Sequence, residues 1–559
     1  MSSNKKSNHF LIQGSILAAA SLLVRVIGLL YRIPMTRIIG DEGMGTYNIA
    51  FEVYNIALIL SSYGLPLAVS KLVAARAINK EHTNSYRIFR FALVFSVIIG
   101  LIAAFILYFG AEFFATVVNE DPYAVLPIRV LAPTIFIFSV MGVFRGFYQG
   151  KNTMIPTAFS QVLEQIINAV VSVAAAYFLM KNYNASVNVT AYGAAGGTLG
   201  TLVGAAVGLL FLIFIFILYR PYLQKQMKND HTEYRESYKE IFKLLVITIS
   251  PIILSQTVYH INGFIDNSIF SKIMTSKEVT QFDRSVFASE TLGKFYTDEN
   301  IRILIGKYGN KYRLLTNLPV AIASAIGAAI VTSITAAKVR GQDQAIRSKT
   351  HAAIKFNMII AMPSAVGMAV LAYPILNLLF PGSHQLEANF LRLGSIAIVF
   401  YSLSTVTTAI LQGINKLKLP VINAAVSLGI HVVLVFLLLK YTSLSTYSLV
   451  IGNVAFALVV SILNWLSIEK YLNYKQEILK SFIIPAISAG LMGVITYFAY
   501  EGLFLLTGSN TLSTLVSLVL AVVTYFALLI FMKGVEEEEL YNLPGGEAIV
   551  RILQKLHLL

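Results

Sequence analysis

Long apolar runs dominate this chain, and short polar or charged stretches separate them. A helix that crosses a bilayer needs about 20 mostly apolar residues, and these runs are too long and too free of two-residue alternation for barrel strands. The pattern therefore predicts an all-α polytopic membrane protein with about 14 transmembrane helices. Their approximate bounds are 12–39, 47–70, 89–110, 126–148, 157–180, 192–219, 242–271, 312–337, 353–378, 389–411, 420–439, 445–467, 481–500 and 511–532.

The first apolar run follows Met-Ser-Ser-Asn-Lys-Lys and ends in the basic stretch 32–37. A secretory signal peptide would instead end in small residues that form a cleavage site. We therefore expect this run to be retained as the first transmembrane helix.

Composition narrows the class of protein. Hydrophobic residues make up 56% of the chain and charged residues 13%, whereas charged residues average about 25% in soluble domains. Cysteine is absent, so no disulfide, thiolate metal site or cysteine nucleophile is available. No phosphate-binding loop, zinc-protease motif or nucleophile elbow occurs in a supporting context. We expect a transporter and not an enzyme, with no metal and no cofactor.

Basic residues are distributed unevenly along the chain. We count residues at the ends of spans with the adjoining loop. If the N-terminus is cytoplasmic, the even-numbered loops and both tails then hold 28 of the 43 Lys and Arg, the opposite loops hold 10, and the interiors of the spans hold five. Because Lys and Arg accumulate on the cytoplasmic side, we expect both termini in the cytoplasm. The net charge of +15 then reflects topology and attraction to anionic lipids, and it does not indicate nucleic-acid binding.

Two segments of the chain match each other at an offset of 263 positions, and the match predicts an internal repeat. The matched residues are Arg129, Phe138-Ser139 and Gln149-Gly150-Lys151-Asn152 in one copy, and Arg392, Tyr401-Ser402 and Gln412-Gly413-Ile414-Asn415 in the other. The pair Leu65-Pro66 also matches Leu318-Pro319. Matched segments lie six spans apart, which gives both copies the same orientation and predicts two parallel lobes around a central cavity, as in transporters.

The repeat predicts a division of the chain into four parts. Residues 1–225 form an N-lobe and 226–470 a C-lobe, each of six helices; 471–535 supply two additional helices, and 536–559 form a cytoplasmic tail. We expect the protein to be a monomer.

Helix-breaking residues occur at corresponding places in the two lobes. Gly28 and Pro34 lie in the first span, and Gly263 aligns with Gly28 in the seventh. These residues are candidate hinges, although close packing explains them equally well. For the glycine-rich run from Gly193 to Gly208, packing is the better interpretation.

Ionisable residues inside spans are functional candidates because they cost several kcal/mol at the bilayer centre. Arg25 and Arg32 are seven residues apart and share one helix face, and guanidinium groups suit phosphate or pyrophosphate. We expect Arg37, Arg129 and Arg392 to extend towards the membrane interface. Four further residues are candidates for a gate or for coupling to the membrane potential or a monovalent cation: Glu52, Glu164, Asp266 and His260. Glu52 and Glu164 could neutralise the first-span arginines, and His260 could equally be a buried core residue.

The residues around the first span resemble those of a known family. The stretch from Leu23 to Pro34 with Arg37 and Gly40, and the stretch from Gly309 to Ile322, are similar to the MurJ-type and stage V sporulation protein B-like branch of the multidrug/oligosaccharidyl-lipid/polysaccharide exporter superfamily. The resemblance implies export of an undecaprenyl-pyrophosphate-linked sugar across a bacterial plasma membrane by alternating access. Its cavity arginines correspond to Arg25 and Arg32. Gram-negative members space them by six residues and carry an aspartate where this chain has Thr46-Tyr47, so no gate residue is transferred.

Several substrates are compatible with these features. A flippase for the peptidoglycan precursor lipid II is the leading hypothesis, and a flippase for another lipid-linked polysaccharide or a spore-cortex precursor is the alternative. A multidrug cation antiporter would require acidic groups in place of Arg25 and Arg32. A membrane glycosyltransferase would require a catalytic acid and an arginine on an external loop. The stretch 272–313 contains Asp283, Glu290, Asp298 and Arg302, but at no informative spacing.

Overall fold

The computed structural model describes residues 16–17, 19–186, 188–232, 234–279, 294–382 and 385–535. Apart from an isolated bridge between Glu278 and Phe295, these residues form helices and the turns that join them. The predicted tail 536–559 lies outside the described residues. The all-α prediction is confirmed.

The described residues divide into two compact units. The first contains residues up to Val279 and from Lys294 to Asn310, and the second begins at Lys311. By packing, the helix Tyr238–Met274 therefore belongs to the first unit. The predicted lobe boundary at residue 225 concerns the sequence repeat, and it stays a prediction.

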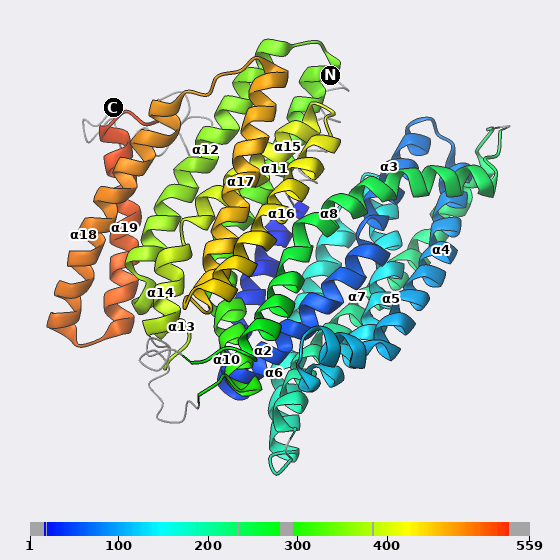
Figure 1. Cartoon of the computed structure of the whole chain (residues 1–559). Coiled ribbons are helices and arrows are strands. Elements are labelled where there is room, and N and C mark those ends of the chain that lie inside the picture. Colours follow the sequence, from blue (N-terminus) through cyan, green and yellow to red (C-terminus); the bar gives the residue numbers. More distant parts are fainter. Residues whose placement is uncertain are drawn as a thin grey trace. The chain divides into compact units, whose positions relative to one another are not determined.

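The first unit contains eight long or medium helices and several short ones among its described residues (Figure 1). The helices are Ala19–Leu30, α2 (Arg32–Leu58), α3 (Leu65–Ile78), α4 (His82–Phe109), α5 (Val125–Gly150), α6 (Ile155–Asn182), α7 (Val189–Lys228), α8 (Tyr238–Met274) and the short α10 (Asp298–Gly306). Short π- or 3₁₀-helical segments cover Ile59–Tyr63, Phe113–Val118 and Pro122–Ala124.

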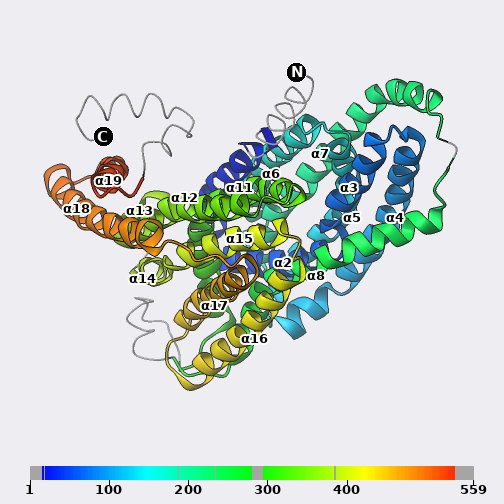
Figure 2. The same ribbon diagram turned by 90° about the horizontal axis from the view of Figure 1, so that it is seen from above.

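The second unit is also helical throughout its described part. It contains α11 (Leu314–Val339), α12 (Asp343–Val370), α13 (Ala372–Leu379), α14 (Gln385–Gly394), α15 (Ala397–Gly413), α16 (Lys418–Tyr441), α17 (Tyr447–Leu472), α18 (Ile484–Thr507) and α19 (Asn510–Phe531). A π-helical segment, Lys307–Arg313, leads into α11, and another, Leu479–Ile483, leads into α18. The last two helices lie against each other, with α18 beside α12 (Figures 1 and 2).

Eleven of the described helices are long and apolar enough to cross a membrane, or up to 13 if each of two bent pairs is one span. The predicted count of 14 is not confirmed. One reason is that Arg32–Ile78 counts as one span where two were predicted, because a kink at Gly40, with φ 70° and ψ 177°, takes the place of the expected loop. Glycine adopts this left-handed backbone without the penalty that other residues incur.

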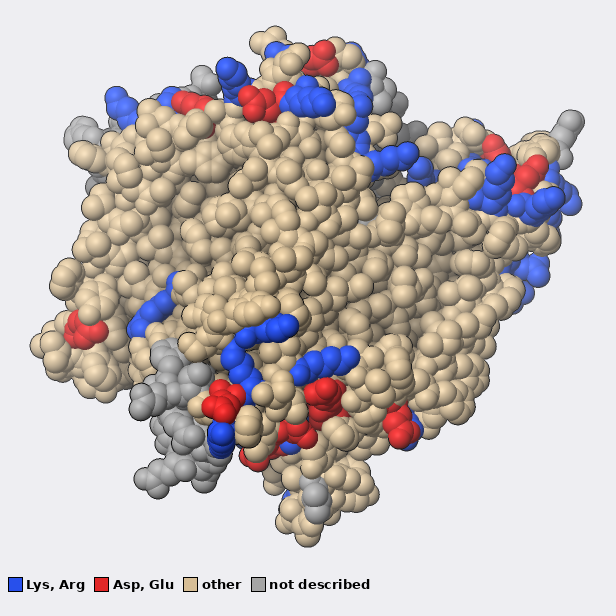
Figure 3. Space-filling model, in the orientation of Figure 1, with Lys and Arg blue, Asp and Glu red and all other residues tan. Residues whose placement is uncertain are grey.

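Charged side chains on the visible face gather mostly towards helix ends (Figure 3). The long middle parts of the helices are largely uncharged there. This distribution is the one that a bilayer imposes on helices that span it.

Glycines bring helices of the first unit close together. A Cβ added at Gly196 would stand 2.6 Å from the Cα of Ala176, and one at Gly200 would stand 2.1 Å from the Ser172 hydroxyl. The same stripe of α7 continues through Gly204, where the obstacle is the carbonyl oxygen of Glu164 at 2.6 Å. The packing interpretation of this glycine run is confirmed.

The matched segments of the repeat end in the same local structure. After α5, Asn152 has φ 62°, and after α15, Asn415 has φ 63°. The amide of Thr153 donates to the carbonyl of Tyr148 (3.0 Å), and the amide of Lys416 donates to that of Leu411 (2.9 Å). Both helices therefore end in the same left-handed cap with a six-to-one hydrogen bond.

The helix α3 packs on the end of α5, and α11 packs on the end of α15. The residues that occupy equivalent places in α3 and α11 differ in number by a different offset from that of the Leu-Pro match. Gly150 faces Val73 on α3, with 2.7 Å between the added Cβ and the Val73 Cβ, and Gly413 faces Ile334 on α11 at 3.0 Å. Val73 and Ile334 are 261 positions apart, whereas Leu65-Pro66 and Leu318-Pro319 are 253 apart. The difference is about two helical turns, so the Leu-Pro match does not join equivalent packing positions and that part of the alignment was wrong.

Candidate functional site

The two candidate arginines lie on one continuous helix. Tyr31, which joins Ala19–Leu30 to α2, has helical backbone angles (φ −71°, ψ −23°). Its amide donates to the carbonyl of Ile27 (3.1 Å), and its carbonyl accepts from the amide of Met35 (3.2 Å). Because the helix is unbroken, Arg25 and Arg32 share a face, and Gly28 lies on that face between them.

The surroundings of the two arginines are aromatic. Arg25 is exposed, and Tyr63 lies near it. The guanidinium carbon of Arg32 lies 5.7 Å from the centre of the Tyr47 ring, whose hydroxyl is 3.0 Å from that of Tyr31. Among the described residues, neither arginine forms an ion pair with a carboxylate.

Gly28 faces the helix α6. A Cβ added at Gly28 would stand 3.3 Å from Nε2 of Gln165. Sequence reasoning did not select Gln165, because nothing along the chain indicates which α6 residue lies opposite Gly28.

The bends of the structure do not coincide with the candidate hinges. The first helix turns sharply at Gly40, beyond Gly28 and Pro34. The helix α8 bends by 41° between Leu254 and Gln256, before Gly263. Pro251 lies one turn earlier, where it removes a helix hydrogen bond. A hinge role for Gly28, Pro34 and Gly263 therefore stays a prediction.

Glu164 has a partner that sequence reasoning did not consider. Its carboxylate accepts from Nη2 of Arg145 at 2.7 Å, and Arg145 also donates to the hydroxyl of Ser160 at 3.1 Å. Arg145 lies in α5, which continues to Gly150, and its side chain reaches α6. The negative charge of Glu164 is thus balanced within the protein by Arg145, and not by an arginine of the first helix.

The other gate or coupling candidates occupy different environments. Glu52 is half-buried on α2, while Asp266 is buried on α8 with 2% exposure and His260 is exposed on the same helix. Their roles stay predictions.

A charged cluster that sequence reasoning missed joins α10 to α2 and to the start of α5. Nη2 of Arg302 donates to Glu42 at 2.8 Å, and Nη1 lies 3.7 Å from Asp121. Asp121 also accepts from the hydroxyl of Thr46 (3.0 Å) and from the amide of Tyr123 (3.1 Å). Thr46, one of the two positions that the family resemblance singled out, serves the cluster as a neutral donor.

Burial dominates the electrostatics of this cluster. Asp121 is 2% exposed, and desolvation raises the pKa of its carboxyl from 3.8 to about 6 although Arg302, Thr46 and Tyr123 oppose the rise. The guanidinium carbon of Arg302 also lies 4.4 Å from the centre of the Tyr123 ring. Arg302 is therefore a structural cation with acidic and aromatic partners, which does not suit the glycosyltransferase alternative. Asp283 and Glu290, which that alternative also needs, lie outside the described residues.

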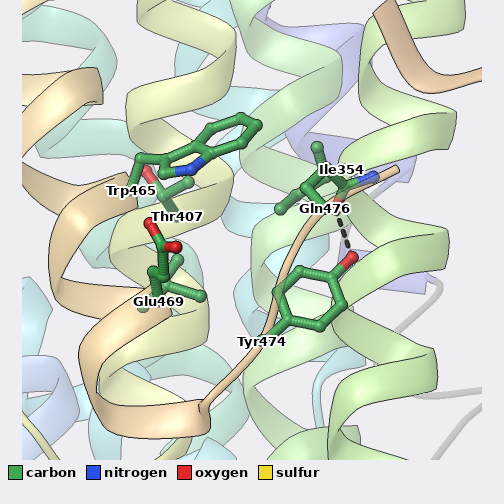
Figure 4. A pocket seen from close by; sticks show the side chains of 7 residues that line it. Ile354, Thr407, Trp465, Glu469, Tyr474 and Gln476 are labelled. Atoms are coloured by element: carbon green, nitrogen blue, oxygen red, sulfur yellow. Dashed lines mark hydrogen bonds between the residues drawn. The ribbon is translucent and has the colours of Figure 1, made fainter. Parts of the chain in front are cut away.

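The second unit contains a buried ion pair and a small pocket. Lys311 donates to Glu387 at 3.0 Å, with side-chain exposures of 5% and 1%. The pocket, of about 210 Å³, is lined by Ile354, Thr407, Trp465, Ile468, Glu469, Tyr474 and Gln476 (Figure 4). Tyr474 donates to Gln476 there. Since no lining residue is Lys or Arg, the pocket does not suit an anionic headgroup.

The chain matches two family models. The model described as polysaccharide biosynthesis protein matches residues 11–334, and the model described as lipid II flippase MurJ matches residues 307–523. The first of these covers more than half of the chain.

Two relatives come from Bacillus subtilis (strain 168). The lipid II flippase MurJ is 27% identical over 499 residues, which cover 87% of each chain. Stage V sporulation protein B is 24% identical over 546 residues, which cover 96% of this chain and 98% of the relative.

Solved structures share the fold at low identity. A lipid II flippase MurJ in an inward closed conformation is 16% identical with a TM-score of 0.60, covering 92% of this chain and 97% of that one. An inward-facing MATE-family multidrug resistance transporter of the MOP superfamily is 18% identical with a TM-score of 0.59, covering 82% and 94%. These relatives are transporters and not enzymes. The chain is a multi-pass membrane protein with the MurJ- and MATE-like fold, and it belongs to the polysaccharide biosynthesis protein family.

Proposed function

We propose that this protein is a flippase that moves the undecaprenyl-pyrophosphate-linked peptidoglycan precursor lipid II from the inner to the outer leaflet by alternating access. The observation that carries the proposal is the pair Arg25 and Arg32 on one face of an apolar helix, with no carboxylate partner among the described residues. Guanidinium groups bind pyrophosphate through paired hydrogen bonds and stay charged at every physiological pH.

The other charged side chains discussed above support this interpretation by contrast. Arg145 is paired with Glu164, Arg302 with Glu42, and Lys311 with Glu387. A charge within a membrane span is costly and is kept where it has a function. An anionic substrate would supply the counter-charge that no described carboxylate supplies to Arg25 and Arg32.

The relatives support the same substrate class. One is a lipid II flippase that matches 87% of this chain. The second candidate is a flippase for another lipid-linked polysaccharide or a spore-cortex precursor, which is favoured by the match to 98% of stage V sporulation protein B. A multidrug cation antiporter shares the fold, but two unpaired arginines would repel its substrate.

The remaining expectations belong to this proposal. Both termini lie in the cytoplasm of a bacterial plasma membrane, transport is coupled to the membrane potential or a monovalent cation, and the protein is a monomer that attracts anionic lipids. Residues 1–225 and 226–470 form the two lobes of the repeat, and 471–535 are additional. Glu52, Glu164, Asp266 and His260 remain candidates for coupling.

Complementation tests the proposal. A host depleted of its lipid II flippase receives the wild-type chain, Arg25→Ala, Arg32→Ala, or Arg37→Ala as the charge-matched control on an exposed helix position. We expect rescue by the wild type and Arg37→Ala, and loss of rescue in the other two at equal expression.

Two results would contradict the proposal in different ways. Failure of the wild type to rescue, together with no lipid II in the outer leaflet of proteoliposomes, would exclude lipid II as substrate. Normal rescue by both Arg25→Ala and Arg32→Ala would exclude the arginines as ligands.

A further inference from the structure

We propose that Gln165 on α6 is a ligand of the substrate headgroup, placed between the two arginines of the first helix and able to accept hydrogen bonds from the sugar next to the pyrophosphate. This inference rests on the proposed function and adds a specificity-determining residue to it.

The position of Gln165 follows from Gly28. Gly28 is three residues after Arg25 and four before Arg32, so the two arginines lie about 4.5 Å and about 6 Å from it along the helix axis. All three residues share one face. Nε2 of Gln165 lies 3.3 Å from where the Cβ of residue 28 would be. The amide therefore lies against the helix backbone, at the level between the two guanidinium-bearing turns.

Within the described part of the chain, the Gln165 side chain has no partner. Among the described residues it makes no hydrogen bond, and it is half-buried. One turn earlier on α6, Oε1 of Gln161 is buried without a partner. A buried amide oxygen costs free energy unless it is hydrogen-bonded, so Gln161 needs a ligand or water, and the half-buried Gln165 has its donors and acceptor free for a ligand.

Other polar residues of α6 show that the helix does not lack partners in general. On the side that faces α7, Asn168 accepts from the hydroxyl of Ser172 at 2.9 Å, and Glu164 accepts from Arg145 at 2.7 Å. The two glutamines of α6 that make no hydrogen bond among the described residues, Gln161 and Gln165, are four residues apart and share the side of the helix on which Gln165 meets Gly28.

The chemistry of an amide complements that of the arginines. A guanidinium group only donates hydrogen bonds, whereas a glutamine amide donates two and also accepts. Gln165 can therefore donate to a pyrophosphate oxygen between the arginines and accept from a hydroxyl or amide of the attached sugar. Because it is neutral, it does not cancel the attraction of the two positive charges for the pyrophosphate.

The test measures binding of two lipids to the full-length protein in nanodiscs: lipid II and undecaprenyl pyrophosphate without sugar. Loss of a hydrogen bond of ordinary strength weakens binding about tenfold. We expect Gln165→Ala to weaken lipid II binding by about that factor and undecaprenyl pyrophosphate binding by less. Gln165→Glu should abolish most binding of both, because its carboxylate would neutralise the arginines.

Two further variants separate binding from folding. Ile166→Ala changes the next residue, which is 45% exposed and about 100° further round α6, and should bind like the wild type. Gly28→Ala keeps both arginines and Gln165 but adds a methyl group at the amide, and should weaken lipid II binding without a loss of thermal stability.

The outcomes distinguish this inference from the proposed function. If the wild type binds neither lipid, the proposed function fails and this inference fails with it. If the wild type binds in an Arg25-dependent way while Gln165→Ala, Gln165→Glu and Gly28→Ala bind both lipids equally well, the proposed function stands and the role of Gln165 is overturned. Equal weakening of both lipids by Gln165→Ala would overturn the sugar contact.

Discussion

Single charged side chains in this protein differ mainly in whether the protein itself balances them. Arg145, Arg302 and Lys311 each have a carboxylate within 3.0 Å. Arg25 and Arg32 have aromatic neighbours instead. This difference is a property of partners far along the chain, and it separates structural cations from candidate ligands for an anion.

Asp121 leads to a prediction on pH. Its folded-state pKa of about 6 exceeds its ordinary value of 3.8 because the carboxyl is buried, so the folded protein holds this proton more tightly than the unfolded chain does. The resulting stabilisation is complete below about pH 4 and is lost as the pH rises through about 6. Relative to that of Asp121→Asn, the free energy of unfolding of the wild type should fall by up to about 2 kcal/mol between about pH 4.5 and 6.5.

Thermal or denaturant unfolding of both proteins in detergent, at several pH values in that range, measures the difference. Above about pH 7 the free energies of unfolding of the two proteins should change with pH in the same way. Parallel curves over the whole range would show that the pKa of Asp121 is not raised.

The pair of Arg145 and Glu164 leads to a second prediction at this scale. Removing one member leaves the other as an uncompensated, largely buried charge, which costs about 3 kcal/mol. We therefore expect Arg145→Ala and Glu164→Ala each to destabilise the protein, and the double variant to be more stable than the sum of the two losses implies. A double-mutant cycle from unfolding in detergent gives the coupling; additive losses would mean that the pair is not formed.

At the scale of elements, two glycines bring α2 and α10 of the first unit into close contact. A Cβ added at Gly45 would stand 1.9 Å from the carbonyl oxygen of Arg302, and one at Gly306 would stand 2.0 Å from that of Asp41. Since both obstacles are backbone atoms, no side-chain rotation can relieve them. The two glycines hold α10 in the place from which Arg302 reaches Glu42 and Asp121.

We predict that Gly45→Ala destabilises the protein by roughly 1 to 3 kcal/mol, because the two helices would have to separate. Gly490→Ala is a matched control: Gly490 lies inside α18 with no atom within 4 Å of the added Cβ. Its better helix propensity should stabilise α18 slightly, by roughly 0.5 to 1 kcal/mol. Thermal unfolding in detergent compares the two variants, and equal melting temperatures would contradict the close contact.

At the scale of the whole molecule, the absence of cysteine in all 559 residues makes topology directly measurable. When a single cysteine is introduced at an exposed position, no other cysteine of the chain reacts with a thiol reagent. We predict that Asn79→Cys and Asn229→Cys are protected from a membrane-impermeant thiol reagent in intact cells, and that Asn184→Cys and Ser276→Cys react.

Permeabilised cells provide the control, since all four cysteines should then react. The reverse pattern in intact cells would invert the proposed orientation. If the two cysteines predicted to lie on one side of the membrane behaved differently in intact cells, one reacting and the other protected, the span assignment would be contradicted instead.

The sequence by itself determined the features that depend on neighbours along the chain. Apolar runs longer than a bilayer needs can only be helices there, because every backbone amide must be hydrogen-bonded within its own segment. Helical periodicity placed Arg25 and Arg32 on one face, and the continuous helix through Tyr31 confirms it. The same local rules predicted the glycine stripe of α7 and the matched ends of α5 and α15.

The tertiary structure decided which distant side chains meet. The pairing of Arg145 with Glu164, the cluster around Arg302, and the position of Gln165 opposite Gly28 join residues from different helices. Packing between helices also showed that Leu65-Pro66 and Leu318-Pro319 are about two helical turns away from equivalent positions. Periodicity states which face a residue occupies, but the rotation and axial displacement of one helix against another follow from side-chain packing between them. That packing, and with it the choice between a balanced charge and a free ligand, exists only in three dimensions.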